Sequence, residues 1–175
     1  MLSKQHIYEL LSEIPDPEIP VINIKELGVL RDVVVNGTEV EVIITPTYSG
    51  CPAMKQIQDD IVSVMKKNGI ENTKVKMVYH PAWTTDWITD EAKEKLRKYG
   101  IAPPHPSPPL PKGEGVTCAT FSPFGGDKRG GVRDVICPHC GSENTEMVSQ
   151  FGSTACKALY KCLDCKEPFD YFKCF

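Results

Sequence analysis

The feature that most constrains this fold is a pair of C-x-x-C motifs near the C-terminal end, Cys137 and Cys140 in CPHCG and Cys162 and Cys165 in CLDCK. Each motif places two sulfurs on one tight turn, and two such turns close around one metal ion at sulfur–metal distances of about 2.3 Å. Gly141 follows the first pair, where the turn needs an unstrained backbone bend. The pattern predicts a small β zinc ribbon.

Other uses of these cysteines are less consistent with the spacing. Paired C-x-x-C units favour a metal cage over buried or disulfide-linked cysteines. A redox C-x-x-C is typical of a single pair that opens a helix, whereas Pro138 and Gly141 indicate turns in hairpins. Iron in a rubredoxin-like site would use the same four sulfurs, so the choice between zinc and iron stays open.

Length and charge limit the classes of protein to consider. A chain of 175 residues allows one domain or two small ones. The segment around the cage is too short to hold a core without its metal, so we expect two unequal domains. With 20 basic and 23 acidic residues the net charge is -3, which lacks the basic footprint of a nucleic-acid partner.

The N-terminal segment MLSKQHIYELLSEI lacks the continuous apolar block of a signal peptide, and no stretch approaches the length of a membrane span. We therefore expect a cytoplasmic protein with no membrane partner. In that compartment the eight cysteines are thiols or metal ligands rather than disulfides.

Helix and strand patterns follow in the order α, β, β, α, β, α over the first hundred residues. This order predicts an α+β domain over residues 1–102, a small mixed sheet covered by helices. The boundaries come from Ser3 and Pro15 for the first helix, Asn36-Gly37 for a type I′ hairpin, Pro52 and Gly69 for the second helix, residues 73–79 for the third strand, and Thr89 and Gly100 for the last helix.

Residues 103–133 are rich in proline, glycine, serine and charge, which predicts a flexible Pro/Gly-rich linker. A PxxP docking role is the alternative, and Cys118 is expected to be an incidental thiol of this segment. The zinc ribbon is then predicted over residues 134–175.

Cys51 lies between Gly50 and Pro52, at the predicted N-cap of the second helix. There the unpaired N–H groups and the macrodipole favour an anion, so we expect a thiol that ionises more easily than a free cysteine. A small buried residue at a tight turn is an equal alternative. One thiolate cannot hold a cluster, so a site would need a second protomer in a homodimer, an outside thiol, or the carboxylates of Asp16 and Glu18.

Several other side chains are expected to be structural. Trp83 and Trp87 favour packing beneath the last helix over stacking on a ligand. His80, before Pro81, favours a turn over a metal ligand. For Cys156 packing is the default, while a second metal site and redox behaviour stay open for Cys156 and Cys174.

Three stretches, DPEIPVINIKELGVL, TPTYSGCPA and WTTDWIT, resemble the MIP18 (DUF59) family associated with iron–sulfur cluster assembly. The tail from CPHCG to the C-terminal CF resembles the ribbon added in one branch of that family, the D subunit of the phenylacetyl-CoA epoxidase system. The family's acidic turn falls on Asp16 and Glu18, and its characteristic cysteine falls on Cys51. The linker has no match in the family pattern.

The resemblance implies an accessory protein without catalysis of its own in aerobic phenylacetate degradation. Such a protein would bind the ring 1,2-epoxidase subunits and aid maturation of iron or iron–sulfur centres in the oxygenase or its reductase. The implied cofactors are a structural zinc and a transient iron or iron–sulfur cluster. A structural binding subunit without metal delivery is the alternative, and a thiol enzyme ranks last because no histidine is placed to act as the base of Cys51.

Overall fold

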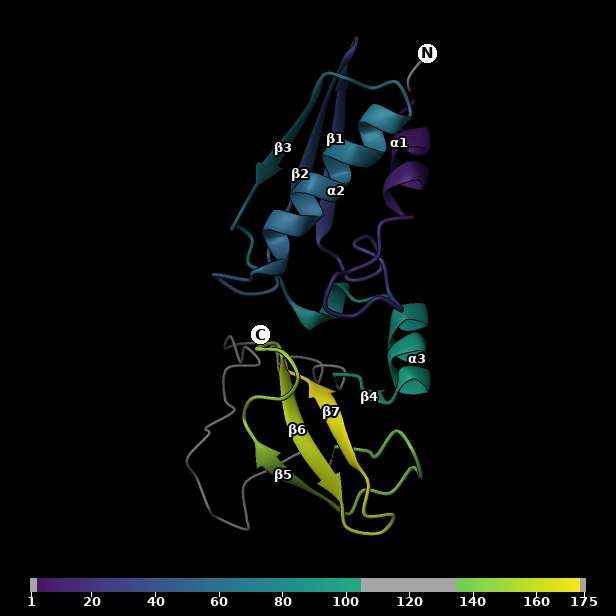
Figure 1. Ribbon diagram of the computed structural model, residues 1–175, viewed down its shortest axis with the longest axis vertical. Helices are drawn as coiled ribbons and strands as arrows, with labels where there is room; N and C mark the ends of the chain where they lie inside the picture. The colour runs from purple at the N-terminus through teal and green to yellow at the C-terminus, as the bar shows by residue number, and fades with distance from the viewer. Residues whose placement is uncertain (1–2, 105–134, 174–175) are drawn as a thin grey trace, which may run out of the picture. The chain divides into compact units, whose positions relative to one another are not determined.

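The computed structural model describes residues 3–104 and 135–173 (Figure 1). The chain divides into two compact units between Ala92 and Lys93, and each is described by itself. Most of the predicted linker, including Cys118, lies outside the described residues, as does Cys174. The predicted domain limits at 102, 103, 133 and 134 therefore stay predictions.

The first unit is a three-stranded sheet with helices on one face (Figure 1). Its elements are α1 (Lys4–Leu11), β1 (Leu30–Asn36), β2 (Glu39–Ile44), α2 (Ala53–Lys67), β3 (Thr73–Met77), a 3-10 turn (Thr85–Trp87) and the start of α3 (Asp90–Tyr99). Strand β2 pairs antiparallel with β1 and parallel with β3. Helix α1 contacts β1, α2 contacts β3, and the two helices contact each other. The predicted α+β fold with a small mixed sheet is confirmed.

The helix boundaries follow from local hydrogen bonds that the sequence predicts. The Ser3 hydroxyl accepts from the His6 N–H at 3.2 Å, and the Thr89 hydroxyl accepts from the Ala92 N–H at 3.1 Å. Both side chains satisfy donors that have no partner inside the helix. Gly69 and Gly100 follow α2 and α3 with φ of 76° and 91°, a conformation that glycine adopts without steric cost.

The hairpin between β1 and β2 is present, but its predicted type I′ geometry is wrong. Asn36 pairs with Glu39, so the loop consists of Gly37 and Thr38 rather than Asn36-Gly37. Gly37 has a φ of 63°, and it is the one residue of this described loop with a positive φ. A type I′ turn requires positive φ at both central residues, and the β-branched Thr38 avoids it.

Strand β2 positions the candidate site of this unit. Val40, Val42 and Ile44 are fully buried beneath the helices and alternate with partly exposed residues. Because β2 and β3 are parallel, α2 is the crossover between them, and the loop that leads to Cys51 leaves the carboxyl end of β2. Loops at the carboxyl ends of parallel strands are common sites of ligand binding.

The second unit is a four-stranded sheet with the order β4-β7-β6-β5. Its strands are β4 (Ile101–Ala102), β5 (Thr145–Ser149), β6 (Lys157–Cys162) and β7 (Pro168–Phe172). Strand β4 pairs parallel with β7, and this unit also takes in most of α3, which begins before its first residue, Lys93. No helix within the described ranges is long and apolar enough to cross a membrane.

Aromatic rings build the core of the ribbon sheet. Tyr160 stacks on Phe169 with ring centroids 6.0 Å apart and meets the edge of Tyr171 at 5.5 Å. Phe172 is 1% exposed. The cluster around Tyr160, Phe169 and Tyr171 also contains Ala102, Val135, Cys137, Ala158 and Cys162, so the cysteine motifs and the apolar core are one packed body.

Candidate metal centres

Four sulfurs converge in the second unit. The Sγ atoms of Cys137, Cys140, Cys162 and Cys165 all lie within 4.8 Å of one another, the one such group of three or more ligand-type side chains in the described residues. Cys137 and Cys165 are 3.8 Å apart, and Cys140 and Cys162 are 3.6 Å apart. A tetrahedral ion with bonds of about 2.3 Å requires sulfur–sulfur edges of about 3.8 Å. The donor set fits one tetrahedral metal ion, and both zinc and iron satisfy this geometry.

The two C-x-x-C turns have a similar backbone conformation. The Gly141 N–H donates to the Cys137 carbonyl, and the Cys137 N–H donates to the Ser142 carbonyl, each at 2.9 Å. The residue after the second cysteine of each pair has a positive φ, 76° at Gly141 and 68° at Lys166. Gly141 was predicted from its lack of a side chain, whereas Lys166 gives no such signal in the sequence.

The cage sulfurs do not share a common acidity. The pKa of Cys162 is lowered to about 6, because the N–H groups of Cys165 and Asp164 donate to its sulfur. For Cys165 the Glu167 N–H acts in the same direction, but burial and the neighbouring thiols raise the pKa to about 12. The Cys162 thiolate therefore forms near neutral pH, and the Cys165 proton leaves when a cation takes its place.

Cys51 lies half-buried at the head of α2 in the first unit. Its sulfur accepts a hydrogen bond from the Ala53 N–H, one of the donors that a helix start leaves unpaired, and a second hydrogen bond links it to the Thr47 side chain. Cys51 thus lies next to the start of this helix, but its predicted N-cap position is wrong by one residue, because Pro52 is the N-cap and α2 begins at Ala53.

Asp16 and Glu18 come from the DPEIP turn before β1. Both carboxylates lie close enough to Cys51 for their charges to raise its pKa. Asp16 is 5% exposed, and its Oδ1 accepts from the N–H groups of Glu18 and Ile19 at 3.0 and 2.9 Å. In the described residues these three side chains do not close into a ligand group like that of the cage. Asp16 thus fixes the turn, and Glu18 is the more accessible carboxylate.

The predicted easy ionisation of Cys51 is wrong. Burial raises the pKa of its thiol above the ordinary value, and the Glu18 and Asp16 charges act in the same direction. The Ala53 N–H and the Thr47 side chain act against this rise but do not cancel it. A buried thiol beside two carboxylates stays protonated until a cation offsets both effects.

One polar atom in the loop before Cys51 lacks a partner. Thr45 is 1% exposed, and its hydroxyl oxygen is the one buried side-chain N or O atom in the described part of the chain without a hydrogen bond. Buried hydroxyls nearly always have a hydrogen-bond partner, so the unpaired Thr45 hydroxyl marks the end of β2 as unusual within the described part of this unit.

Trp83, Trp87 and Cys156, which are expected to be structural, make packing or hydrogen-bond contacts. The Trp83 Nε1–H donates to the Leu27 carbonyl at 2.9 Å, and the Arg31 guanidinium lies 3.5 Å from the centroid of the Trp87 ring. His80 is exposed and joins no ligand group among the residues described. Cys156 is 3% exposed and lies 3.0 Å from the Thr154 hydroxyl, in agreement with packing.

Comparison with known families assigns a class to each part. Residues 4–78 match the family described as "Iron-sulfur cluster assembly protein", and residues 122–173 match "PaaD zinc beta ribbon domain". A crystal structure of a DUF59 domain of unknown function from Bacillus anthracis superposes with a TM-score of 0.50 at 29% identity. That match covers 53% of this chain and 90% of the other. The fold and the cysteine cage thus define an iron–sulfur cluster assembly (DUF59) domain joined to a zinc ribbon.

The whole-chain relative is more specific. A protein of Escherichia coli (strain K12), named as the putative D subunit of 1,2-phenylacetyl-CoA epoxidase, is 47% identical over 168 residues, 96% of this chain and 91% of that protein. The chain belongs to the family of these epoxidase D subunits. A protein of Porphyromonas gingivalis (strain ATCC BAA-308 / W83) named "Fe-S protein maturation auxiliary factor" is 32% identical over 54% of this chain and 90% of its own length.

Proposed function

We propose that this protein is a non-catalytic accessory subunit of a phenylacetyl-CoA epoxidase system in aerobic phenylacetate degradation. In this proposal it works in the cytoplasm, binds the epoxidase subunits and aids maturation of an iron or iron–sulfur centre of the oxygenase or its reductase. The names of the relatives with similar sequences support this role. The observation that carries it is the contrast between a four-sulfur cage and a single half-buried thiol beside carboxylates.

The cage is proposed to hold a structural zinc. Cys137, Cys140, Cys162 and Cys165 supply the whole tetrahedral set, and three of these side chains are buried or partly buried. Bound metal would supply the folding free energy that a sheet of this size lacks. Such an ion stays with the chain and leaves no open position for chemistry.

Cys51 is proposed to handle iron or a cluster as cargo. The thiol gives up its proton to solvent as the sulfur–iron bond forms, and the incoming positive charge offsets the burial and carboxylate effects that had kept the thiol neutral. Glu18 and Asp16 attract the cation to this place. Because one sulfur and two carboxylates are an incomplete set for a cluster, the remaining ligands come from the recipient or a second protomer, and the cargo is released readily.

Anaerobic iron–sulfur reconstitution tests this assignment. Wild-type protein and Cys51→Ser are loaded with iron and sulfide, desalted and compared by visible absorption. We expect the Cys51→Ser protein to lose most of the absorption, because serine is a poor ligand for the soft cluster iron.

A matched control keeps the first site intact. The Cys140→Ser plus Cys162→Ser protein should retain the wild-type absorption, because it leaves Cys51, Asp16 and Glu18 unchanged. Equal absorption of the wild-type and Cys51→Ser proteins would sink the assigned role of Cys51.

A second candidate function is a structural binding subunit that delivers no metal. The observation in its favour is that Asp16 is buried and already accepts two backbone hydrogen bonds, which is the role of a turn-forming residue. Stable co-purification with the epoxidase subunits, together with full epoxidase activity in a Cys51→Ala strain, would favour this candidate.

A further inference from the structure

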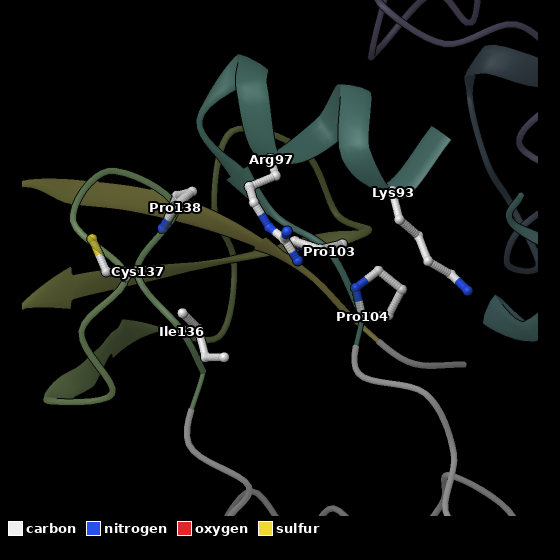
Figure 2. Close-up of a pocket in the computed structure, with 8 residues that line it drawn as sticks. Lys93, Arg97, Pro103, Pro104, Ile136, Cys137 and Pro138 are labelled. Carbon is white, nitrogen blue, oxygen red and sulfur yellow. The ribbon is translucent and has the colours of Figure 1, made fainter. Parts of the chain in front are cut away.

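A hollow of about 400 Å³ opens on the second unit beside the first cysteine turn (Figure 2). One wall is α3, which contributes Lys93 and Arg97. The remaining wall is Pro103, Pro104, Ile136, Cys137, Pro138 and Gly141. The hollow lies entirely within the compact unit that begins at Lys93.

The charges of the lining are of one sign. Lys93 and Arg97 stand one helical turn apart, so their side chains share a face of α3, and the eight described residues of the lining include no carboxylate. Arg97 contacts Glu94 of its own helix at 3.2 Å, with both side chains more than half exposed. Exposed pairs of this kind are weak, so an incoming acid can replace Glu94.

The rest of the lining is mostly apolar and partly exposed. Ile136 is 42% exposed, and the lining also holds Pro103, Pro104 and Pro138, which have no backbone N–H donors (Figure 2). A ligand between the walls therefore needs acidic groups on the side toward α3 and apolar groups on the other side. Pockets that enclose most of a ligand's surface are typical of small-molecule sites. This hollow is shallow and carries an exposed apolar residue, which favours a segment of a protein as the ligand.

An extended peptide has this two-sided character. Its alternate side chains point to opposite faces, and residues two apart lie about 6.8 Å apart, close to the spacing of about 6 Å between side chains one helical turn apart. We propose that this hollow binds an extended segment of a partner protein in which acidic and apolar residues alternate. The acids pair with Lys93 and Arg97, and the apolar side chains pack on Ile136 and the prolines.

Fluorescence anisotropy with the full-length, zinc-loaded protein tests the proposal. The probe is a fluorescein-labelled peptide of alternating leucine and glutamate, and its partner probe carries glutamine in place of glutamate. We expect the glutamate probe to bind at least about ten-fold more tightly than the glutamine probe at low ionic strength, and salt to reduce the difference. Lys93→Ala plus Arg97→Ala should weaken binding of the glutamate probe by about ten-fold.

The same helix supplies the control. Lys95→Ala plus Lys98→Ala removes the same charge from α3 at residues that do not line the hollow, and it should change binding by less than about two-fold. The exchange Lys93→Arg plus Arg97→Lys should restore binding and so excludes misfolding as the cause of a loss. Equal binding of the two probes, or equal losses in the two double-alanine variants, would overturn the proposal. Neither result bears on Cys51, so the proposed function is tested separately.

Discussion

The cysteine sulfurs of the two candidate sites behave differently because their neighbours differ. At Cys162 backbone N–H groups point at the sulfur and lower its pKa to about 6. At Cys51 one N–H is opposed by burial and by two carboxylates, and the pKa rises. The identity of the side chain is the same, so the surroundings decide how readily each of these two sulfurs loses its proton.

Glu18→Gln should lower the pKa of the Cys51 thiol, because it removes one of the two charges that oppose the thiolate. The measurement is the pH profile of alkylation at Cys51, followed by mass spectrometry of the zinc-loaded protein. Glu13→Gln, an exposed residue of the same segment, is the matched control and should leave the profile unchanged. A profile that Glu18→Gln leaves unmoved would contradict the proximity of this carboxylate.

The raised pKa also sets a pH dependence of stability. The folded protein holds the Cys51 proton more tightly than the unfolded chain does, so the contribution is full below the unfolded thiol pKa of about 8.5. It is lost as pH rises through the higher folded pKa. Wild-type unfolding free energy should therefore fall more steeply than that of Cys51→Ala as pH rises from about 8.5 towards the folded pKa, as measured by urea titration.

Gly28→Ala should destabilise the first unit far more than Gly37→Ala. Both glycines have positive φ, 77° and 63°, but a Cβ at Gly28 would lie 2.7 Å from the Trp87 Cβ and 3.1 Å from its carbonyl oxygen. At Gly37 nothing lies within 4 Å. We expect losses of about 3 kcal/mol and about 1 kcal/mol in unfolding free energy. Fluorescence of the two tryptophans, Trp83 and Trp87, reports this unit in a urea titration, and equal losses would contradict the packing.

At the scale of elements, local chemistry predicted most of the structure. Caps at Ser3 and Thr89 and the glycines at 69 and 100 set three helices, and the cysteine spacing predicted the cage. Local patterns do not predict tertiary strand pairing. They miss the parallel pairing of β3 with β2 and the pairing of Ile101–Ala102 with β7. A two-residue strand before prolines has no periodicity to detect, and burial at Cys51 depends on segments distant in the sequence.

The ribbon should depend on its metal as one cooperative element. Cys140→Ser plus Cys162→Ser removes one ligand from each C-x-x-C turn, so we expect loss of bound zinc and unfolding of β5, β6 and β7. Element analysis measures the zinc, and near-ultraviolet circular dichroism reports the packing of Tyr160, Phe169 and Tyr171. Tryptophan fluorescence of the first unit should stay unchanged. A folded ribbon without metal would contradict this dependence.

At the scale of the whole molecule, the chain joins a unit with one isolated thiol site to a unit with a complete cage. The maturation-factor relative matches about half of the chain, whereas the Escherichia coli epoxidase relative matches nearly all of it. The first half is thus shared with proteins named for iron–sulfur maturation, and the ribbon is what distinguishes the family of epoxidase D subunits. We infer that metal handling belongs to the first unit and that the ribbon adds a surface for partners.

The most direct test of this division is a chelator challenge of the protein loaded anaerobically with both zinc and iron, with both elements measured in the same sample. We expect a moderate chelator to remove the iron while about one zinc ion per chain remains, because one thiol with carboxylates binds more weakly than four thiolates. Cys51→Ser should hold zinc but no iron from the start. Loss of both elements together, or iron that resists the chelator as zinc does, would contradict this division.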